Sequence, residues 1–211
     1  RLYYFCMDLY PEVGKISGDF SNPILFKLLE KIDNWNCKQA DLIIVHSSDM
    51  KRTLEQRKTN KKLKIKIINN FSVPSESKLE NNLKIKDIIK KNKLSIIFAG
   101  NIGRFQRLDK IVEAMSLIKY RSDIELIIMG DGVAKKDLKE QVKKTSANVT
   151  FFDYQPINIV KDAIKKADIG LVTLMPNTYK YAYPGKVMTY LEQGRPFIST
   201  IEPESELART M

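Results

Sequence analysis

Short apolar runs alternate with amphipathic stretches along almost the whole of this 211-residue chain. Each apolar run is long enough for one strand, and the stretches between the runs repeat apolar residues at helical spacing. Such an alternation is typical of βα units, in which successive parallel strands are joined through helices. The chain is therefore predicted to have an α/β fold with doubly wound sheets, which bind ligands beyond the carboxyl ends of their strands.

The alternation falls into two series, separated by a polar and charged stretch over residues 71–93. The first series predicts strands over 2–7, 42–45 and 64–68, a helix over 22–37, and a further helix capped by Ser48. The helix over 22–37 repeats apolar residues at helical spacing, namely Ile24, Leu25, Leu28, Leu29 and Ile32. The second series predicts strands over 95–99, 125–129, 149–152, 169–174 and 197–201, and helices over 108–119, 134–145, 159–167 and 187–193.

The two series predict two Rossmann-like domains joined by a linker. The first domain is expected over residues 1–75, the linker over 76–93 and the second domain over 94–211. Residue 1 is Arg and leads directly into a strand, while residues 204–211 resemble a helix that stops partway. We therefore expect both domains to be incomplete and the chain to be part of a longer protein.

Cysteine usage predicts neither a disulfide framework nor a metal site. Cys6 and Cys37 form no CxxC motif, and the chain has a single histidine, His46. A reducing cytoplasm is the compartment that fits this composition. No apolar run approaches the ~20 residues that a membrane-spanning helix needs.

The net charge of +11 is concentrated in one segment. Residues 51–66 hold eight Lys and Arg side chains against Glu55 alone. A solvated lysine-rich face is the favoured interpretation, because such runs are usually ordinary surface. A peripheral contact with anionic lipid at the inner face of the cell membrane is the alternative. Nucleic acid is not predicted as a partner, because no aromatic interleaving or binding motif accompanies the charge.

A glycine-containing turn follows the strand over 95–99 and precedes a helix, which places it on the ligand side of the sheet. The turn reads Gly100-Asn101-Ile102-Gly103-Arg104-Phe105-Gln106. Its glycines let the backbone approach a ligand closely, and Arg104 and Arg107 offer charge-assisted hydrogen bonds to phosphate. A purely structural turn is an equally open interpretation. The spacing is GxxG rather than GxGxxG, which disfavours a dinucleotide-binding dehydrogenase.

A second candidate lies where Pro184-Gly185 is expected to open a helix that begins with Lys186. Free backbone N–H groups and a lysine at the positive end of a helix suit the diphosphate of a nucleotide. The alternative is a well-formed helix start with an exposed lysine.

Several motifs together resemble the group 1 glycosyltransferases (family 4), which have the GT-B fold of two facing Rossmann-like domains. They occur in the family's order along nearly the whole chain: residues 8–12 (DLYPE), 40–45 (ADLIIV), 66–70 (KIINN), 100–103 (GNIG), 129–132 (MGDG), 167–172 (ADIGLV) and 184–196. The match is with the subgroup that assembles capsule, O-antigen and exopolysaccharide. Each motif is modest, but their shared order is specific.

The resemblance implies a retaining transfer of a sugar from a UDP- or GDP-sugar to a lipid-linked or growing polysaccharide acceptor. The nucleotide-sugar is then a substrate, and no cofactor is expected. The implied diphosphate-binding residues are Gly100, Asn101, Gly103, Arg104, Gln106, Pro184, Gly185 and Lys186. The implied ribose and base region comprises Gly130, Tyr154, Gln155 and Thr189. No D-x-D motif occurs in the chain, so a metal-independent mechanism is expected.

The chain departs from the family at several of these positions. Many members have Arg and Lys where this chain has Asn101 and Gln106, and Arg104 and Lys186 are the available replacements. The family also places glutamates at the positions of Tyr181 and Thr189, of which the second holds the donor ribose. A threonine substitutes only partly for a bidentate carboxylate.

Two other functions stay open. One is a sugar-nucleotide epimerase of GT-B fold, and the other is a non-catalytic nucleotide-binding or scaffold subunit, which Tyr181 and Thr189 in place of glutamates would favour. No catalytic residue is predicted. His46 is expected to be a packing residue at a strand end, and Asp8 and Glu12 either face a cleft or stabilise a turn.

Overall fold

The computed structural model describes residues 1–18, 20–57, 62–72, 88–90 and 92–211. The chain forms two compact units. The first comprises Arg1–Asn70, Leu174–Pro184 and Ile201–Met211, and the second comprises Phe71–Thr173 and Gly185–Thr200. Most of the predicted linker over 76–93 lies outside the described residues.

The first unit is built on a parallel sheet with the strand order β1-β2-β3. Its described elements are β1 (Tyr3–Phe5), α1 (Glu12–Ser17), α2 (Pro23–Gln39), β2 (Leu42–Val45), α3 (Ser48–Gln56), β3 (Ile65–Ile67), the 3-10 turn η2 (Thr178–Lys180) and α9 (Glu206–Thr210). The prediction of three strands is confirmed, with shorter ends for the outer two. The sequence pattern missed α1, because six residues are too few to show a helical period.

Two late segments of the chain join this unit through hydrogen bonds. The Leu9 N–H donates to the Tyr181 carbonyl oxygen at 2.7 Å, and the Thr53 hydroxyl donates to the Lys180 carbonyl at 2.9 Å. The Glu206 N–H at the start of α9 donates to the Asp49 carboxylate at 2.6 Å. Residues that follow β7 and β8 in the chain therefore complete the first unit.

Local capping explains where α2 and α3 begin. The Asn22 side chain accepts hydrogen bonds from the N–H groups of Ile24 and Leu25, and Pro23 occupies the first helical position, where its missing N–H costs nothing. For α3 the predicted cap is wrong by one residue. The Ser47 hydroxyl accepts from the Met50 N–H at 3.1 Å, and Ser48 is the first helical residue.

Helix α2 packs with the opposite face to the one its sequence suggests. Its buried positions are Asp33 and Cys37, whereas Ile24 is 80% exposed and Leu28 is 53% exposed. Asp33 is held inside because it accepts hydrogen bonds from two other groups of this unit, Tyr4 and Arg57. The apolar spacing therefore predicted the helix but not the face that is buried.

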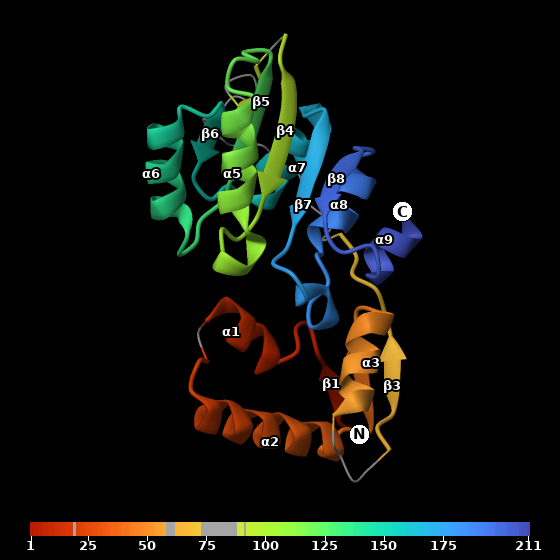
Figure 1. Ribbon diagram of the computed structural model, residues 1–211. Helices are drawn as coiled ribbons and strands as arrows, with labels where there is room; N and C mark the ends of the chain where they lie inside the picture. The colour runs from red at the N-terminus through yellow and green to blue at the C-terminus, as the bar shows by residue number, and fades with distance from the viewer. Residues whose placement is uncertain (19, 58–61, 73–87, 91) are drawn as a thin grey trace. The chain divides into compact units, whose positions relative to one another are not determined.

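The second unit is a five-stranded parallel sheet with the order β6-β5-β4-β7-β8 (Figure 1). Its described elements are β4 (Leu94–Ala99), the 3-10 turn η1 (Arg104–Gln106), α5 (Leu108–Leu117), β5 (Ile124–Met129), α6 (Lys135–Thr145), β6 (Val149–Phe152), α7 (Ile157–Lys166), β7 (Ile169–Thr173), α8 (Lys186–Glu192) and β8 (Phe197–Thr200). The strand order reverses between β4 and β7, as in doubly wound sheets. The predicted fold class is thus confirmed.

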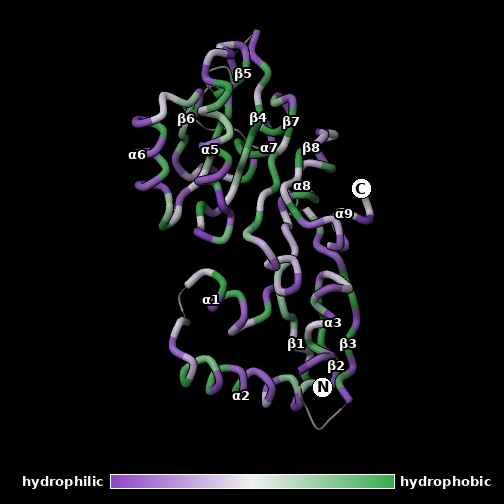
Figure 2. Tube along the Cα trace, in the orientation of Figure 1, coloured by the Kyte–Doolittle hydropathy of each residue, from purple (hydrophilic) through white to green (hydrophobic). Residues whose placement is uncertain are grey.

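Both faces of this sheet are buried. Phe98, Leu126 and Ile128 pack with residues of α5 and α6 in one core cluster. The alternate residues Ile97 and Ile127, which point to the opposite face, are also fully buried. Figure 2 shows the consequence, since the central strands are largely hydrophobic and α6 is largely hydrophilic. None of the helices in the described part of the chain is long and apolar enough to cross a bilayer.

Candidate functional site

A pocket of about 210 Å³ lies where β4, β5 and β6 of the second unit end. It is lined by Ala99, Gly100, Met129, Tyr154, Gln155, Ile157, Val160, Ile164, Lys186 and Thr189. Ala99 and Met129 are the last residues of β4 and β5, and Tyr154 follows β6 by two residues. The pocket therefore occupies the carboxyl edge of the sheet, beside the reversal of strand order where doubly wound sheets bind ligands.

Two glycines let the backbone come together at this edge. Gly100 and Gly130 have φ angles of +139° and +144°, which other residues rarely adopt. A Cβ atom on Gly130 would lie 2.0 Å from the Gly100 carbonyl oxygen. Gly130 therefore brings the turn after β5 against the turn after β4, so its place in the structure is explained by close packing.

Lys186 is the one basic residue in the lining of this pocket. Its ammonium donates to the Gln106 side-chain oxygen at 3.1 Å and lies 4.7 Å from the centre of the Phe98 ring. No carboxylate lies within ion-pair distance of it among the described residues. Burial lowers the pKa of Lys186 to about 8, because removal from water disfavours the charged form.

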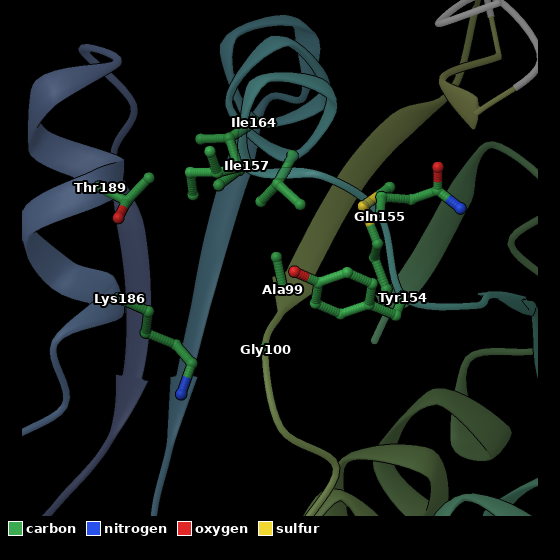
Figure 3. A pocket seen from close by; sticks show the side chains of 10 residues that line it. Ala99, Gly100, Tyr154, Gln155, Ile157, Ile164, Lys186 and Thr189 are labelled. Atoms are coloured by element: carbon green, nitrogen blue, oxygen red, sulfur yellow. The ribbon is translucent and has the colours of Figure 1, made fainter. Parts of the chain in front are cut away.

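The opposite wall of the pocket is mostly apolar. Ile157, Val160 and Ile164 share one face of α7, and the Tyr154 ring, 75% exposed, stands at the rim. Figure 3 shows Lys186 and Thr189 projecting from α8 on one side, with Tyr154 on the other and Ile157 and Ile164 between them. A lone cation facing an apolar wall suits a ligand with an anionic group and a flat apolar group.

The structure brings five of the predicted donor-site residues into this pocket: Gly100, Tyr154, Gln155, Lys186 and Thr189. Gln106 is buried beside it through its hydrogen bond with Lys186. Gly103 and Arg104 line a different hollow between η1, α5 and α6. Asn101, Gly130, Pro184 and Gly185 are not in the lining of either one.

Helix α8 is as short as predicted and begins one residue before the predicted range of 187–193. It has seven residues and begins at Lys186, with Gly185 as its N-cap. Two turns of helix supply only a few aligned peptide dipoles, so the lysine side chain is the main positive group here.

Sequence reasoning missed the apolar half of the pocket. Ile157, Val160 and Ile164 read as the core-facing stripe of an ordinary helix, because core and pocket positions have the same spacing. Phe98, whose ring lies beside the Lys186 ammonium, likewise reads as strand core.

The candidate residues of the first unit have structural partners. His46 is 2% exposed, its Nδ1 lies 3.1 Å from the Ile68 carbonyl oxygen, and its ring packs edge-on against Phe5. Glu12 forms an ion pair with Arg57. Asp8 forms a β-bridge with Ala182, and burial raises the pKa of its carboxyl.

The basic segment over 51–66 is partly neutralised. Lys51 pairs with Glu55 and Arg52 pairs with Asp49, while Arg57 is buried among carboxylates. Residues 58–61 lie outside the described residues. Three of the eight basic side chains therefore already have anionic partners, which favours the solvated-face interpretation of this segment.

The two parallel sheets, the second of them doubly wound, define a Rossmann-like type of α/β protein. The family described as "Glycosyl transferases group 1" matches residues 93–209, more than half of the chain. This chain belongs to that family. The resemblance inferred from the motifs is thereby confirmed.

Relatives and a solved structure agree with this assignment. The chain is 24% identical to "Probable glycosyltransferase WbjE" of Pseudomonas aeruginosa, over 96% of this chain and 51% of the relative. It is 29% identical to WcaI of Escherichia coli (strain K12), a protein named for colanic acid biosynthesis, over 62% of this chain and 31% of the relative. The crystal structure of Anabaena Alr3699/HepE, in complex with UDP and glucose, superposes with a TM-score of 0.66 at 15% identity. That superposition covers 94% of this chain and 52% of HepE, and it supports the GT-B fold class.

Proposed function

We propose that the protein transfers a sugar from a nucleotide-sugar donor to a lipid-linked or growing polysaccharide acceptor. The chain spans 51% of the length of WbjE, so this activity is a proposal for the whole protein. Capsule, O-antigen or exopolysaccharide assembly is the setting that the family's subgroup suggests. The relative named for colanic acid biosynthesis agrees with it.

The pocket at the carboxyl edge of the second sheet is the observation that supports the proposal best. A nucleotide-sugar has a flat base, a ribose and a diphosphate. The apolar wall of α7 and the Tyr154 ring suit the base, and the Thr189 hydroxyl, which also lines the pocket, suits the ribose. Lys186 then meets the diphosphate, which is the group that leaves with the nucleotide.

Lys186 has the electrostatic properties that this reaction needs. Negative charge grows on the diphosphate as the bond to the sugar breaks, and a cation placed in advance stabilises that charge without reorganisation. A lysine without a carboxylate partner is free to give its whole charge to the ligand. We propose a retaining transfer in which Lys186 takes the place that a metal ion has in metal-dependent enzymes.

Nucleotide binding is the first test, and isothermal titration of the whole protein with UDP and GDP measures it. We expect one of the two diphosphates to bind in the micromolar range and the Lys186→Met variant to bind it at least about tenfold more weakly, since a hydrogen bond to a charged group is worth ~1.5–3 kcal/mol. Lys110→Met is the matched control, because Lys110 is an exposed lysine on α5 outside the pocket. Binding of neither diphosphate would overturn the proposal.

Product analysis separates the proposed transfer from its two alternatives. A glycosyltransferase releases the nucleoside diphosphate in proportion to glycan product, and an epimerase releases it without an acceptor. A scaffold subunit binds nucleotide with no turnover, which is the outcome that the Thr189 substitution would favour. We expect transfer, and we expect it to persist in EDTA because the proposed mechanism uses no metal ion.

The proposed setting is the cytoplasm, where nucleotide-sugars are the donors. Association with anionic lipid remains a prediction of the basic segment over 51–66. Sedimentation of the whole protein with anionic and with neutral vesicles tests it, and equal pelleting would identify the segment as ordinary surface.

A further inference from the structure

A second pocket, of about 460 Å³, lies wholly within the first unit. Helices α1, α2 and α3 and the segment that contains Tyr181 supply its lining. Four of the eight lining residues are charged and four are neutral but polar. Its composition therefore contrasts with the apolar pocket of the second unit, and its charge balance indicates what it can bind.

Arg57 forms a rigid side of this pocket, because all of its hydrogen-bonding directions are already used. Its Nε and one terminal nitrogen donate to the two Glu12 carboxylate oxygens at 2.9 and 2.6 Å. The same terminal nitrogen donates to the Tyr10 carbonyl at 2.9 Å, and the other donates to Asp33 and, at 3.5 Å, to the Asn34 side-chain oxygen. Asp33 also accepts from the Tyr4 hydroxyl at 2.7 Å, which locks the network in place. Arg57 consequently has no directed hydrogen bond left for a ligand.

The charges around the pocket exclude a phosphate as its occupant. Glu12 and Glu30 face Lys31 and Arg57, so the lining sums to zero. Since Arg57 is committed to carboxylates, Lys31 is the remaining cation, and two carboxylates oppose any anion that approaches it. A phosphate or sulfate would therefore meet repulsion about as strong as its attraction. A ligand without net charge fits this balance.

The neutral groups of the lining offer both donors and acceptors. The Gln56 carboxamide can donate and accept, and the Asn34 carboxamide, whose oxygen already accepts from Arg57, has its N–H groups to donate. Thr53 already donates within the protein, so its oxygen is left to accept. Neither the Gln56 carboxamide nor the Tyr181 hydroxyl has a hydrogen bond to another described residue. The half-buried Tyr181 ring adds an apolar surface with a polar tip.

We propose that this pocket binds one neutral sugar unit of the acceptor glycan. A sugar ring has several hydroxyl groups, each a donor and an acceptor, which suit mixed carboxamide, hydroxyl and carboxylate partners. Its C–H faces suit the Tyr181 ring. The proposal rests on the proposed function, because only a transferase that extends a glycan needs such a subsite, and it adds the class of acceptor: an uncharged sugar.

Saturation-transfer NMR on the whole protein tests the proposal. UDP is present at saturation, so that the nucleotide pocket of the second unit is filled. The probes are glucose, galactose, mannose and N-acetylglucosamine, with glucose 6-phosphate as the charged comparison. We expect at least one neutral sugar to give a signal with a dissociation constant of roughly 1 mM, in keeping with a few neutral hydrogen bonds, and glucose 6-phosphate to give a weaker one.

Asn34→Ala and Gln56→Ala should each weaken that signal about fivefold, the size of one neutral hydrogen bond. Both leave the ion pairs of Arg57 intact, so equal melting temperatures show that the fold is kept. Asn36→Ala is the matched control, because Asn36 is an exposed amide on the same helix outside the pocket, and it should change nothing.

Three results would overturn the assignment: no neutral sugar binds, the phosphorylated sugar binds best, or both pocket variants bind as wild type does. The first two reject the sugar class, and the third moves the sugar to another site. UDP titration of the same samples is the independent readout. If the wild-type protein does not bind UDP, the proposed function is rejected. If it binds UDP but gives no sugar signal, only this subsite is rejected.

Discussion

Arg57 in the first unit and Lys186 in the second are enclosed basic side chains held in opposite ways. Arg57 is paired with Glu12 and Asp33. Burial by itself lowers the pKa of Arg57, but the hydrogen bonds and the negative charge of the two carboxylates outweigh burial, so the pKa lies above its usual value. Among the described residues, Lys186 contacts only the Gln106 carboxamide and the Phe98 ring in this way, and burial lowers its pKa to about 8. A cation satisfied by the protein stabilises the fold. One left without a carboxylate is available to a ligand.

The same contrast extends to the two pockets. The pocket beside Arg57 is charge-balanced and polar, while the pocket beside Lys186 is apolar with one cation. The difference teaches that a basic residue in a pocket identifies an anion site only if its own hydrogen bonds are not already used.

The largest expected effect is on stability, and it comes from removing Arg57, the cation that is paired within the protein. Arg57→Met leaves Glu12 and Asp33 enclosed without a counter-charge, and breaking a buried pair in this way costs about 3–5 kcal/mol of unfolding free energy. Urea unfolding measures it. Arg52→Met is the control, because the Arg52 side chain is 59% exposed and its buried partner Asp49 is also paired with Arg209. A loss no greater than in the control would mean that Arg57 is not the centre of the network.

Removing Lys186, the cation without a carboxylate partner among the described residues, should leave the fold intact and slow the proposed transfer. We expect Lys186→Ala to lower kcat/KM. The fall should correspond to a loss of about 2–4 kcal/mol in transition-state stabilisation, the size typical of a preorganised electrostatic group. Steady-state kinetics of the whole protein measure the loss, with Lys110→Ala as the control. A kcat/KM close to that of wild type would show that the two cations do not differ in the proposed way.

The pH dependence tests the low pKa of Lys186 directly. Affinity for the nucleoside diphosphate should be full below about pH 8 and fall as pH rises through that value, because the neutral amine attracts the phosphates less. Stability should change in the opposite sense. Between pH 8 and 10.5 the unfolded chain holds the lysine proton and the folded chain does not, so the contribution of Lys186 to the unfolding free energy rises with pH.

The control for both titrations is Lys186→Met, which cannot lose a proton. It should show neither the fall in affinity nor the rise in stability over that range. If wild type and variant follow the same curves, the lysine does not titrate near pH 8.

The smallest expected effect comes from giving Lys186 a carboxylate of its own. Thr189→Glu adds one on the same face of α8, three residues away, where pairs of opposite charge on a helix are worth a few tenths of a kcal/mol. The midpoint of the affinity titration should therefore move upward in pH by a fraction of a unit, while Thr189→Gln leaves it in place. A midpoint equal in both variants would place the added carboxylate out of reach of Lys186.

Much of the fold was predictable because backbone periodicity is a local property. The strands over Leu42–Val45 and Val149–Phe152 were predicted residue for residue, and α5, α6 and α7 to within two residues at either end. The family motifs extended this to the two-sheet architecture. Half of the residues that line the pocket of the second unit were named in advance. Gly100 and Lys186 lie in a turn and a helix start that follow strands, whereas Tyr154, Gln155 and Thr189 were implied by the family resemblance.

The sequence by itself therefore determined the order of strands and helices, the family, and the edge of the sheet at which the pocket lies. Only the tertiary structure decided that, among the described residues, Arg57 has carboxylate partners and Lys186 has none. Arg57 lies in a basic run and Lys186 in a helix start, so both look available in the sequence. The partners of Arg57 are 24 and 45 residues away in the chain, and no local pattern reports them. Charge is a property of a residue, whereas its neutralisation depends on distances that exist only after folding.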